Sequence, residues 1–280
     1  MNPTMNRMIK RITEVARNNS LEKRTVQVGL HVTLGAFVLA LLLGLCAPKL
    51  SASVCTGLPT EAQLKIFLAN AASGTGISQP LGPGTGVGGL FGGKRMWVAV
   101  VNRNGEICAY VTSTSDATQV WPGSQQIAKA KAYTANSFSL DSLALSTARL
   151  YTFVQPGHSL YGLNESNPFN TLFLAPPSGN GGGKNQIAGG IITFGGGVPL
   201  YTATGSIIGG LGVSGDTACT DHEIAKRVRD LAALNPPGGP LVDDISYSSV
   251  DSASVFSHPV CLNTLRNGVF IGNENPASGY

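Results

Sequence analysis

Charge is the property that this sequence has least of. Only 12% of the 280 residues are charged, and the formal net charge is +4. Seven Lys and Arg residues and two acidic residues lie in residues 1–52, which leaves the rest of the chain with a net charge of −1. A nucleic-acid-binding protein needs a concentrated basic surface to neutralise phosphates. The composition therefore argues against a nucleic-acid partner.

Several catalytic and binding motifs are also missing. A phosphate-binding loop would need Ser or Thr where Arg95 follows Gly93-Lys94, and no CxxC or HxxxH spacing offers a zinc site. Gly210–Gly215 satisfies GxGxxG, but its glycines lie in a predicted strand and no βαβ unit follows. The GxSxG of a serine hydrolase is absent, because Leu211 stands where its first glycine belongs. We identify no catalytic residue, and an enzymatic function is the less favoured interpretation.

The chain has one long apolar run, from Val26 to Cys46, which follows a basic stretch. With the small residues Ser51-Ala52-Ser53, this pattern predicts a secretory signal peptide in residues 1–52. The run is nearly long enough to span a bilayer, so an uncleaved signal anchor is the alternative, and it would be the only contact with a membrane. In either case we expect the rest of the chain to be exported, to the periplasm or the extracellular space.

Export changes how the cysteines are interpreted. Four of the five lie outside the N-terminal segment, and in an oxidising compartment they favour two disulfides, for which three connectivities are possible. We favour Cys219 with Cys261, which would pin a C-terminal tail, 235–280, to the domain. Cys55 with Cys108 would then tie the mature N-terminus to a strand. The sequence alone leaves the other pairings open.

A sheet flanked by helices is predicted for the rest of the chain. The first two predicted strands are joined by an Asn-Gly turn and are apolar on both faces, so we expect this pair to be central and covered on both sides. Runs of β-branched and aromatic residues between glycine turns predict strands at 96–101, 106–112, 187–194, 198–201 and 206–213. Helical periodicity and capping signals predict helices at 60–72, 125–136, 140–153 and 220–234.

The last predicted helix has its start written in the sequence. Thr220-Asp221-His222-Glu223 fits a capping box, with acidic residues at the positive end of the helix dipole. The apolar positions Ile224, Val228 and Leu231 predict one buried stripe. We expect the basic residues between them to face solvent: Lys226, Arg227 and Arg229.

Two segments of this chain resemble one known family. GGGVPLY (195–201) is followed by a glycine turn, GGLGVSG (209–215) and an acidic pair that opens a helix, and AKAKAYTANSF (128–138) matches earlier in the chain. Together they resemble the GlcG/HbpS-like haem-binding domain family (PduO C-terminal-like) in an exported bacterial form. The resemblance implies an α/β (α+β) fold with profilin-like α-β-α layers, an antiparallel sheet flanked by helices. We therefore expect such a domain at 53–234, with the disulfide-stapled tail packed on it.

The resemblance also implies where a ligand would bind. It places the helix that carries Lys131 and Thr134 at the border of a pocket, where Lys131 would pair a haem propionate and Thr134 would donate to or ligate the haem. The alternative is that Lys131 is solvated and Thr134 makes a helix-packing contact. The glycine turn is the other expected border of the pocket: Gly195, Gly196, Gly197 and Pro199.

Few side chains remain as metal ligands. Among the histidines, His158 in a glycine-proline loop and His222 in the first turn of the last helix are candidate axial ligands, whereas His258 is interpreted as structural. Asp221 and Glu223 would offer a carboxylate pair for a metal ion, although helix capping explains both equally well.

The leading hypothesis is an exported, homo-oligomeric protein that binds haem, or another tetrapyrrole or small planar ligand, for sensing, storage or scavenging. The alternative is a structural subunit of an extracellular assembly with a vestigial pocket. An enzyme that modifies haem or a small acid ranks below both.

Overall fold

The computed structural model describes residues 55–173 and 183–274. The chain divides into two units, Met1–Ser51 and Ala52–Tyr280, and the described residues all belong to the second. The predicted signal segment, 1–52, therefore lies outside the described residues. In the part of the chain that the structure describes, none of the helices combines the length and the apolar character needed to cross a bilayer.

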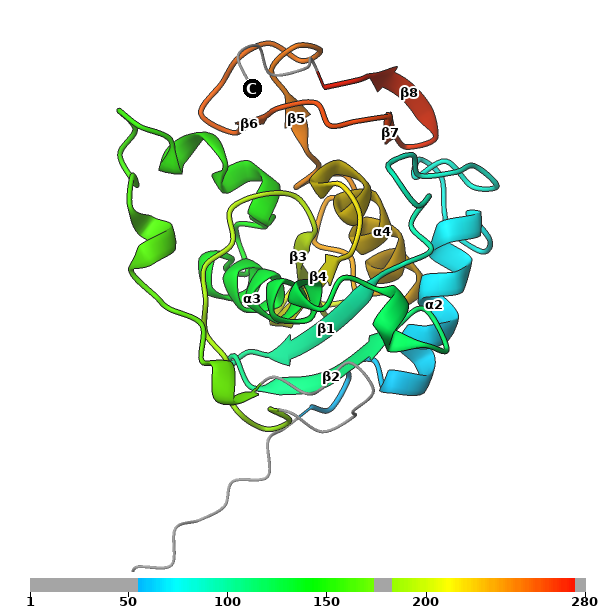
Figure 1. Cartoon of the computed structure of the whole chain (residues 1–280), viewed down its shortest axis with the longest axis vertical. Coiled ribbons are helices and arrows are strands. Elements are labelled where there is room, and N and C mark those ends of the chain that lie inside the picture. Colours follow the sequence, from blue (N-terminus) through cyan, green and yellow to red (C-terminus); the bar gives the residue numbers. More distant parts are fainter. Residues whose placement is uncertain (1–54, 174–182, 275–280) are drawn as a thin grey trace, which may run out of the picture. The chain divides into compact units, whose positions relative to one another are not determined.

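The second unit is built on one antiparallel sheet of four strands (Figure 1). The order across the sheet is β2-β1-β4-β3. We expected both β1 and β2 to be central, but only β1 is, because β2 forms an edge of the sheet. The register pairs Val98 of β1 with Val111 of β2 on one side and with Val213 of β4 on the other. The strands are β1 (Trp97–Asn102), β2 (Ile107–Thr112), β3 (Gly197–Tyr201) and β4 (Ile207–Ser214).

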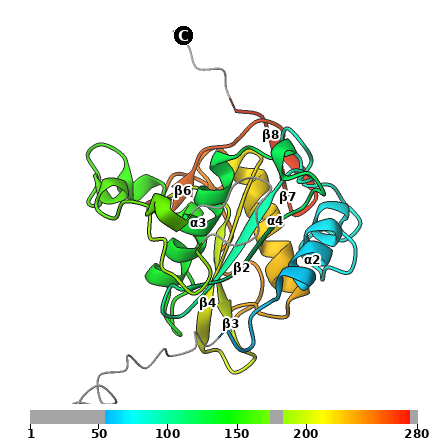
Figure 2. The ribbon, with the colours of Figure 1, turned by 60° about the horizontal axis from the view of Figure 1, so that its bottom comes forward.

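Helices cover both faces of this sheet, as expected (Figure 2). The helix α3 (Gly123–Phe138) lies on one face, and α2 (Glu61–Ser73) and α4 (Ala218–Leu231) lie on the other. Alternation along β1 feeds both layers, because Val98 and Val100 join the core under α2 and α4 while Ala99 and Val101 join the core under α3. The result is an α-β-α arrangement with two apolar cores.

The helix starts follow the sequence in one case and depart from it in another. The capping box of α2 forms as predicted, with the Thr60 hydroxyl accepting from the Gln63 backbone N–H. In α4, however, the cap is Thr217, whose hydroxyl accepts from the Thr220 N–H, and Thr220 lies inside the helix. The predicted start was therefore one turn late, because two Thr residues three positions apart both satisfy the pattern.

Two predicted elements do not form. Residues 187–194 make no strand; their backbone lies against α3, where the Ile192 N–H donates to the Thr134 hydroxyl, and one isolated bridge joins Gly189 to Phe169. Residues 140–153 form no α-helix, since Leu140 and Leu143 exchange backbone hydrogen bonds in a tight turn. Short 3₁₀ turns follow instead: η2 (Thr147–Leu150) and η3 (Thr152–Val154). The others in the described residues are η1 (Ala117–Gln119), η4 (Leu163–Glu165) and η5 (Thr171–Phe173).

The C-terminal segment packs over the outer side of α4. It contains a parallel pair, β5 (Ser246–Tyr247) with β6 (Ser257–His258), and a hairpin of β7 (Thr264–Arg266) and β8 (Val269–Gly272). Asn267-Gly268 form the two-residue hairpin turn, and both have positive φ. A disulfide joins Cys219 to Cys261, and a second joins Cys55 to Cys108. Both favoured pairings are confirmed.

Candidate ligand site

The glycines of β4 allow a helix, rather than a ligand, to approach the sheet. A Cβ on Gly210 would meet the carbonyl oxygen of Ala132, and one on Gly212 would meet that of Ala128. The glycine turn before β3 is packed in the same way: a Cβ on Gly195 would meet the Ala218 carbonyl. The neighbouring positions, Gly196 and Gly197, and Pro199 in β3 are buried as well. The glycines at 195, 197, 210 and 212 are therefore close-packed against the backbone of α3 and α4.

Lys131 does not border an open pocket. Its ammonium group is fully buried, 2.7 Å from Asp221 Oδ2 and 2.9 Å from the Val213 carbonyl oxygen, and it lies over the Phe194 ring. Burial lowers the pKa of Lys131 and raises the pKa of Asp221 to about 6, in both cases against the effect of the ion pair. Both sequence interpretations of Lys131, as a propionate partner and as a solvated side chain, differ from this internal ion pair.

Thr134 is buried and bonds within its own helix and to residues 190–192. Its hydroxyl donates to the Ala130 carbonyl at 2.7 Å and accepts from the Ile192 N–H at 3.0 Å. Both its donor and an acceptor position are thus used within the domain.

The acidic pair of α4 is split between two lysines. Asp221 is bound to Lys131, and Glu223 Oε1 lies 2.7 Å from Lys226 Nζ. His222, which lies between them in the sequence, is fully buried. Its Nε2 is 3.5 Å from Asp244 Oδ1, and neither ring nitrogen has a hydrogen-bond partner among the described residues. These side chains offer internal contacts rather than a shared metal site.

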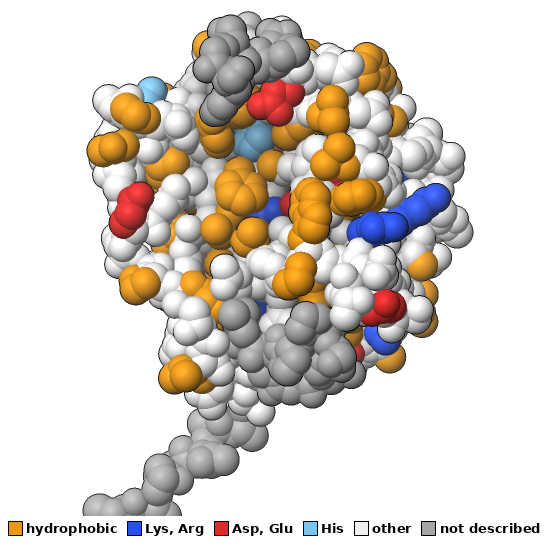
Figure 3. All heavy atoms as spheres, in the orientation of Figure 1, with side chains coloured by type: hydrophobic (Ala, Val, Ile, Leu, Met, Phe, Trp, Pro, Cys, Tyr) orange, Lys and Arg blue, Asp and Glu red, His pale blue; other side chains and the backbone are white. Residues whose placement is uncertain are grey.

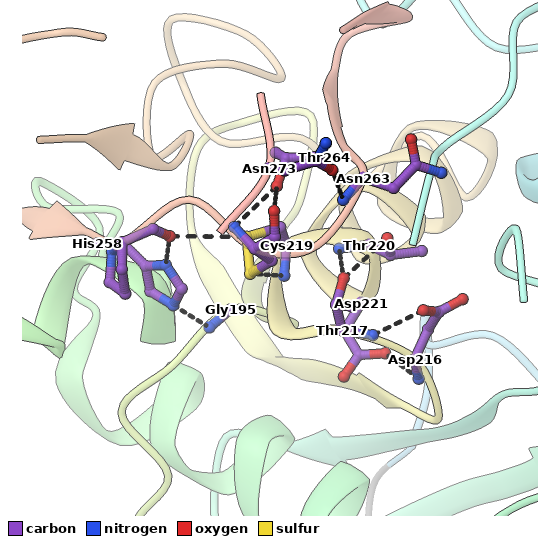
Figure 4. Close-up of a disulfide and its surroundings, with 12 residues drawn as sticks. Gly195, Asp216, Thr217, Cys219, Thr220, Asp221, His258, Asn263, Thr264 and Asn273 are labelled. Atoms are coloured by element: carbon purple, nitrogen blue, oxygen red, sulfur yellow. Dashed lines mark hydrogen bonds between the residues drawn. A yellow bond between two sulfur atoms is a disulfide. The ribbon is translucent and has the colours of Figure 1, made fainter. Parts of the chain in front are cut away.

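One group of described residues has the spacing of metal ligands, but two of its ligand atoms are already bonded to each other. Cys219, His258 and Cys261 lie close together, but the two sulfur atoms are joined in a disulfide (Figure 4). A disulfide sulfur lacks the thiolate that binds metal ions. The cluster is therefore structural as it stands.

The basic residues of α4 are buried, contrary to expectation. Arg229 forms a two-pronged ion pair with Asp243, at 2.9 and 2.7 Å, and Lys226 binds Asp244 at 2.6 Å. Arg227 donates to the carbonyls of Ala71 and Thr85. The sequence around α4 could not reveal this, because the covering acids come from the tail.

A cavity of about 540 Å³ opens between the tail and the segment that contains η2 and η3. His158 and Tyr151 line it from that segment, and His258 lines it from the tail. Apolar tail residues complete the wall, including Val255 and Pro259. Figure 3 shows hydrophobic side chains gathered across the middle of the drawn face, with only scattered charged ones among them. Of the predicted ligand residues, His158 is the one that the structure places in this cavity.

His258 is held rigidly at the inner wall of the cavity. Its Nδ1 lies 2.7 Å from the Pro259 carbonyl oxygen, which assigns the ring proton to Nδ1, and Nε2 accepts from the Gly195 N–H at 3.4 Å (Figure 4). The Tyr151 ring lies 4.9 Å from the imidazole. Burial lowers the pKa of His258 to about 4, so the ring is neutral at pH 7. The sequence interpretation of His258 as structural fits these bonds but missed its place in the cavity wall.

Asp216 is a second residue that the sequence interpretation missed. Its carboxylate accepts from the backbone N–H groups of Leu90, Phe91 and Thr217 at 2.6, 2.8 and 2.7 Å. It thereby fixes the end of the glycine-rich loop 73–94 against the start of α4. An acid directly before an N-cap Thr was the available signal.

Comparison with known proteins identifies the family. A family model described as "Haem degrading protein HbpS-like" matches residues 90–230. The chain belongs to this family. Corrinoid adenosyltransferase PduO of Salmonella typhimurium is 33% identical over 112 residues, which is 40% of this chain but 25% of PduO, and the Citrobacter freundii protein is 32% identical over the same share. The match thus spans about a quarter of the length of these curated relatives.

Two solved structures are similar in fold. The crystal structure of Klebsiella pneumoniae protein ORFY has 24% sequence identity and a TM-score of 0.41, covering 61% of this chain and 86% of that one. The crystal structure of a PduOC:heme complex has the same identity and TM-score, and the match covers 62% of this chain and 92% of that one.

Proposed function

We propose that this protein binds haem, and that the cavity lined by Tyr151, His158 and His258 holds it. Membership of the HbpS-like family carries this proposal. The volume of about 540 Å³ lies within the range of small-molecule sites. A haem site needs apolar walls and a side chain that can ligate iron. This cavity has both, with Val255 and Pro259 in its wall and His158 at its exposed edge.

In this proposal His158 would ligate the haem iron. Its side chain is exposed on a loop, whereas His222 is fully buried and both ring nitrogens of His258 face backbone groups. Arg149 lies outside the cavity lining, with its guanidinium over the Phe256 ring of the tail, and is proposed as the basic side chain that would meet a propionate. Haem, when bound, supplies the iron chemistry; the chain supplies the slot, the imidazole and the exclusion of water.

A haemin titration followed through the Soret band tests the proposal. The wild-type protein, folded and oxidised, is expected to give a saturable, shifted band, and His158→Ala is expected to weaken binding at least tenfold. Ser159→Ala, on the same exposed loop, is the matched control and should bind like the wild type. A non-saturating response in the wild type would remove the haem proposal and favour the structural subunit. Tight binding by His158→Ala would remove only His158 from its role.

The physiological role proposed is sensing, storage or scavenging rather than turnover. The support is the fixed hydrogen bonding of His258 and the pairing of the acids in α4, which leaves them engaged with lysines. The test is to follow the Soret band of the complex with a reductant and oxygen present. A stable band supports binding alone, and its loss with release of iron would show haem degradation.

Export is proposed as well. The two disulfides support it, because such bonds persist in oxidising compartments. Cell fractionation followed by the intact mass of the mature chain tests this. Recovery of the full-length, reduced chain from the cytoplasm would contradict it.

Assembly into homo-oligomers is the remaining part of the proposal. Val269 and Phe270, both on β8, have 63% and 55% of their surfaces exposed, and exposed apolar side chains support a contact between subunits. Sedimentation of the purified protein separates a closed oligomer from a monomer or an open fibre.

A further inference from the structure

A lysine of α4 and an asparagine of the tail are in contact where the tail packs on the helix. Lys226 Nζ, in α4, lies 2.9 Å from Oδ1 of Asn267, in the turn of the β7–β8 hairpin. Figure 1 shows this hairpin beside the end of α4 that faces the tail. The Lys226 side chain is 0% exposed, whereas Asn267 is half-buried. The Lys226 amine is thus held against the Asn267 carboxamide, and the amine is shielded from solvent.

Asp244 touches both nitrogen atoms of this pair. Its Oδ1 lies 2.6 Å from Lys226 Nζ, and its Oδ2 lies 3.3 Å from Asn267 Nδ2. One carboxylate therefore connects the nitrogen of the amine with the nitrogen of the carboxamide. This is the position of a proton shuttle between an attacking and a leaving group.

Glu223 supplies a second carboxylate. Its Oε2 accepts from the Asn267 backbone N–H at 3.0 Å and so fixes the turn. Its Oε1 lies 2.7 Å from Lys226 Nζ and accepts no hydrogen bond with good angles from any described residue. This oxygen is placed to take a proton from the ammonium group.

We propose that Lys226 and Asn267 are a modification site, at which the chain forms an intramolecular isopeptide bond between Lys226 Nζ and Asn267 Cγ. Lys226 offers the amine and Asn267 the carboxamide. Two carboxylates, of Asp244 and Glu223, each contact both of these residues.

The reaction balances without an oxidant or a cofactor. The ammonium of Lys226 first gives a proton to Glu223, and the amine lone pair attacks Asn267 Cγ while the carbonyl electron pair moves onto Oδ1. Asp244 takes a second proton from Nζ and delivers it to Nδ2. The carbonyl re-forms, the Cγ–Nδ2 bond breaks, and ammonia leaves and takes up the proton held by Glu223. One amide is exchanged for another, and ammonium is the by-product.

The electrostatics of the cluster explain why two acids are present. Burial by itself lowers the pKa of Lys226, but Asp244 and Glu223 outweigh that effect and raise it. The resting group is therefore an ammonium ion, which is not a nucleophile, and it becomes one only when a neighbouring carboxylate accepts a proton. Holding the two groups in contact supplies the proximity that an uncatalysed amide exchange lacks.

The bond would give the tail a second covalent anchor. The disulfide already ties the tail to the start of α4 at Cys219, and Lys226 lies two turns further along the same helix. The tail supplies one wall of the haem cavity, so both links would hold that wall in place.

Mass spectrometry of the full chain, recovered from the host after folding, tests the proposal. After reduction of the disulfides and denaturation, the chain is expected to be lighter by one ammonia than the mass of the same chain without the bond. Digestion should give a branched peptide that joins the Lys226 and Asn267 segments. A chain of unchanged mass would overturn the proposal. So would a chain whose mass shows deamidation at Asn267-Gly268 in place of the loss of ammonia.

Variants separate the bond from simple packing. Asn267→Ala and Lys226→Arg should each show no loss of ammonia, and Asp244→Asn should retain both partners yet remain unlinked or link far more slowly. Asn263→Ala is the matched control, because Asn263 also has positive φ in the tail but binds the Gly89 carbonyl instead of Lys226. Its mass should show the same loss as the wild type; absence of the branched peptide from the control and the wild type alike would refute the bond.

Discussion

Lys131 and Asp221 form a fully buried ion pair at 2.7 Å. The pair connects α3 on one face of the sheet with α4 on the other, and the Val213 carbonyl of β4 accepts from the same ammonium group. The two residues come from the two segments that resemble the HbpS-like family, so what joins these segments in space is a structural ion pair.

Breaking this pair on one side should be costly. Lys131→Met leaves the Asp221 carboxylate buried without its cation, and we expect a loss of about 3–5 kcal/mol in the free energy of unfolding. The double variant Lys131→Met/Asp221→Leu removes both charges and should be clearly more stable than the single one. Urea denaturation of the three proteins measures the difference; a double variant as unstable as the single one would contradict this account.

Acidification should destabilise the protein through His258. Its pKa is lowered to about 4 by burial, below the ordinary 6.5, so between these values the unfolded chain binds a proton that the folded one does not. The contribution is fully present above pH 6.5 and falls by about 3 kcal/mol as the pH approaches 4. The raised pKa of Asp221 acts in the opposite direction. The effect of His258 is therefore measured as the difference in the free energy of unfolding between the wild type and His258→Gln. The variant should show a flatter pH dependence between 4 and 6.5. Equal slopes for the two proteins would disprove the role of His258.

The close packing of α3 on β4 predicts a strong effect of one added methyl group. Gly212→Ala would force a Cβ into the Ala128 carbonyl, and we expect a loss of about 1–3 kcal/mol or more. Gly123→Ala, at the start of α3, is the matched control, because a Cβ there meets open space. It should be neutral or stabilising by about 0.5 kcal/mol. Thermal denaturation ranks the two, and equal effects would count against the packing.

The two disulfides should protect different parts of the molecule. Removing Cys219–Cys261 with a double Ser substitution should cost about 2–4 kcal/mol and expose the tail to limited proteolysis. Removing Cys55–Cys108 should cost a similar amount without new cleavage in 248–263. Mapping the first cleavage sites distinguishes them. If the Lys226–Asn267 bond is present, a fragment cut in the tail of the first variant stays attached to α4.

The elements with strong local signals were predictable. The β1–β2 hairpin followed from alternating apolar residues around an Asn-Gly turn, and α2 followed from its capping box. The position of each cysteine favoured the disulfide pairing that the structure shows, but three connectivities were open until the structure decided between them. Residues 187–194 have the composition of a strand and residues 140–153 have the periodicity of a helix, yet neither element forms. In 187–194 the Ile192 N–H instead bonds to the Thr134 hydroxyl of α3, and in 140–153 Leu140 and Leu143 bond to each other in a tight turn.

The sequence by itself predicted helices on an antiparallel sheet and favoured the two disulfides, because periodicity, capping signals and cysteine placement are local and leave a pattern in the chain. Its two motif segments indicated the family. Only the tertiary structure decided what the charged residues do. Lys226, Arg229 and Lys131 have the local pattern of solvated or ligand-facing side chains, yet each is buried against an acid from another element. The physical reason is that burial of a charge depends on a partner, and these partners lie between 14 and 90 residues away along the chain.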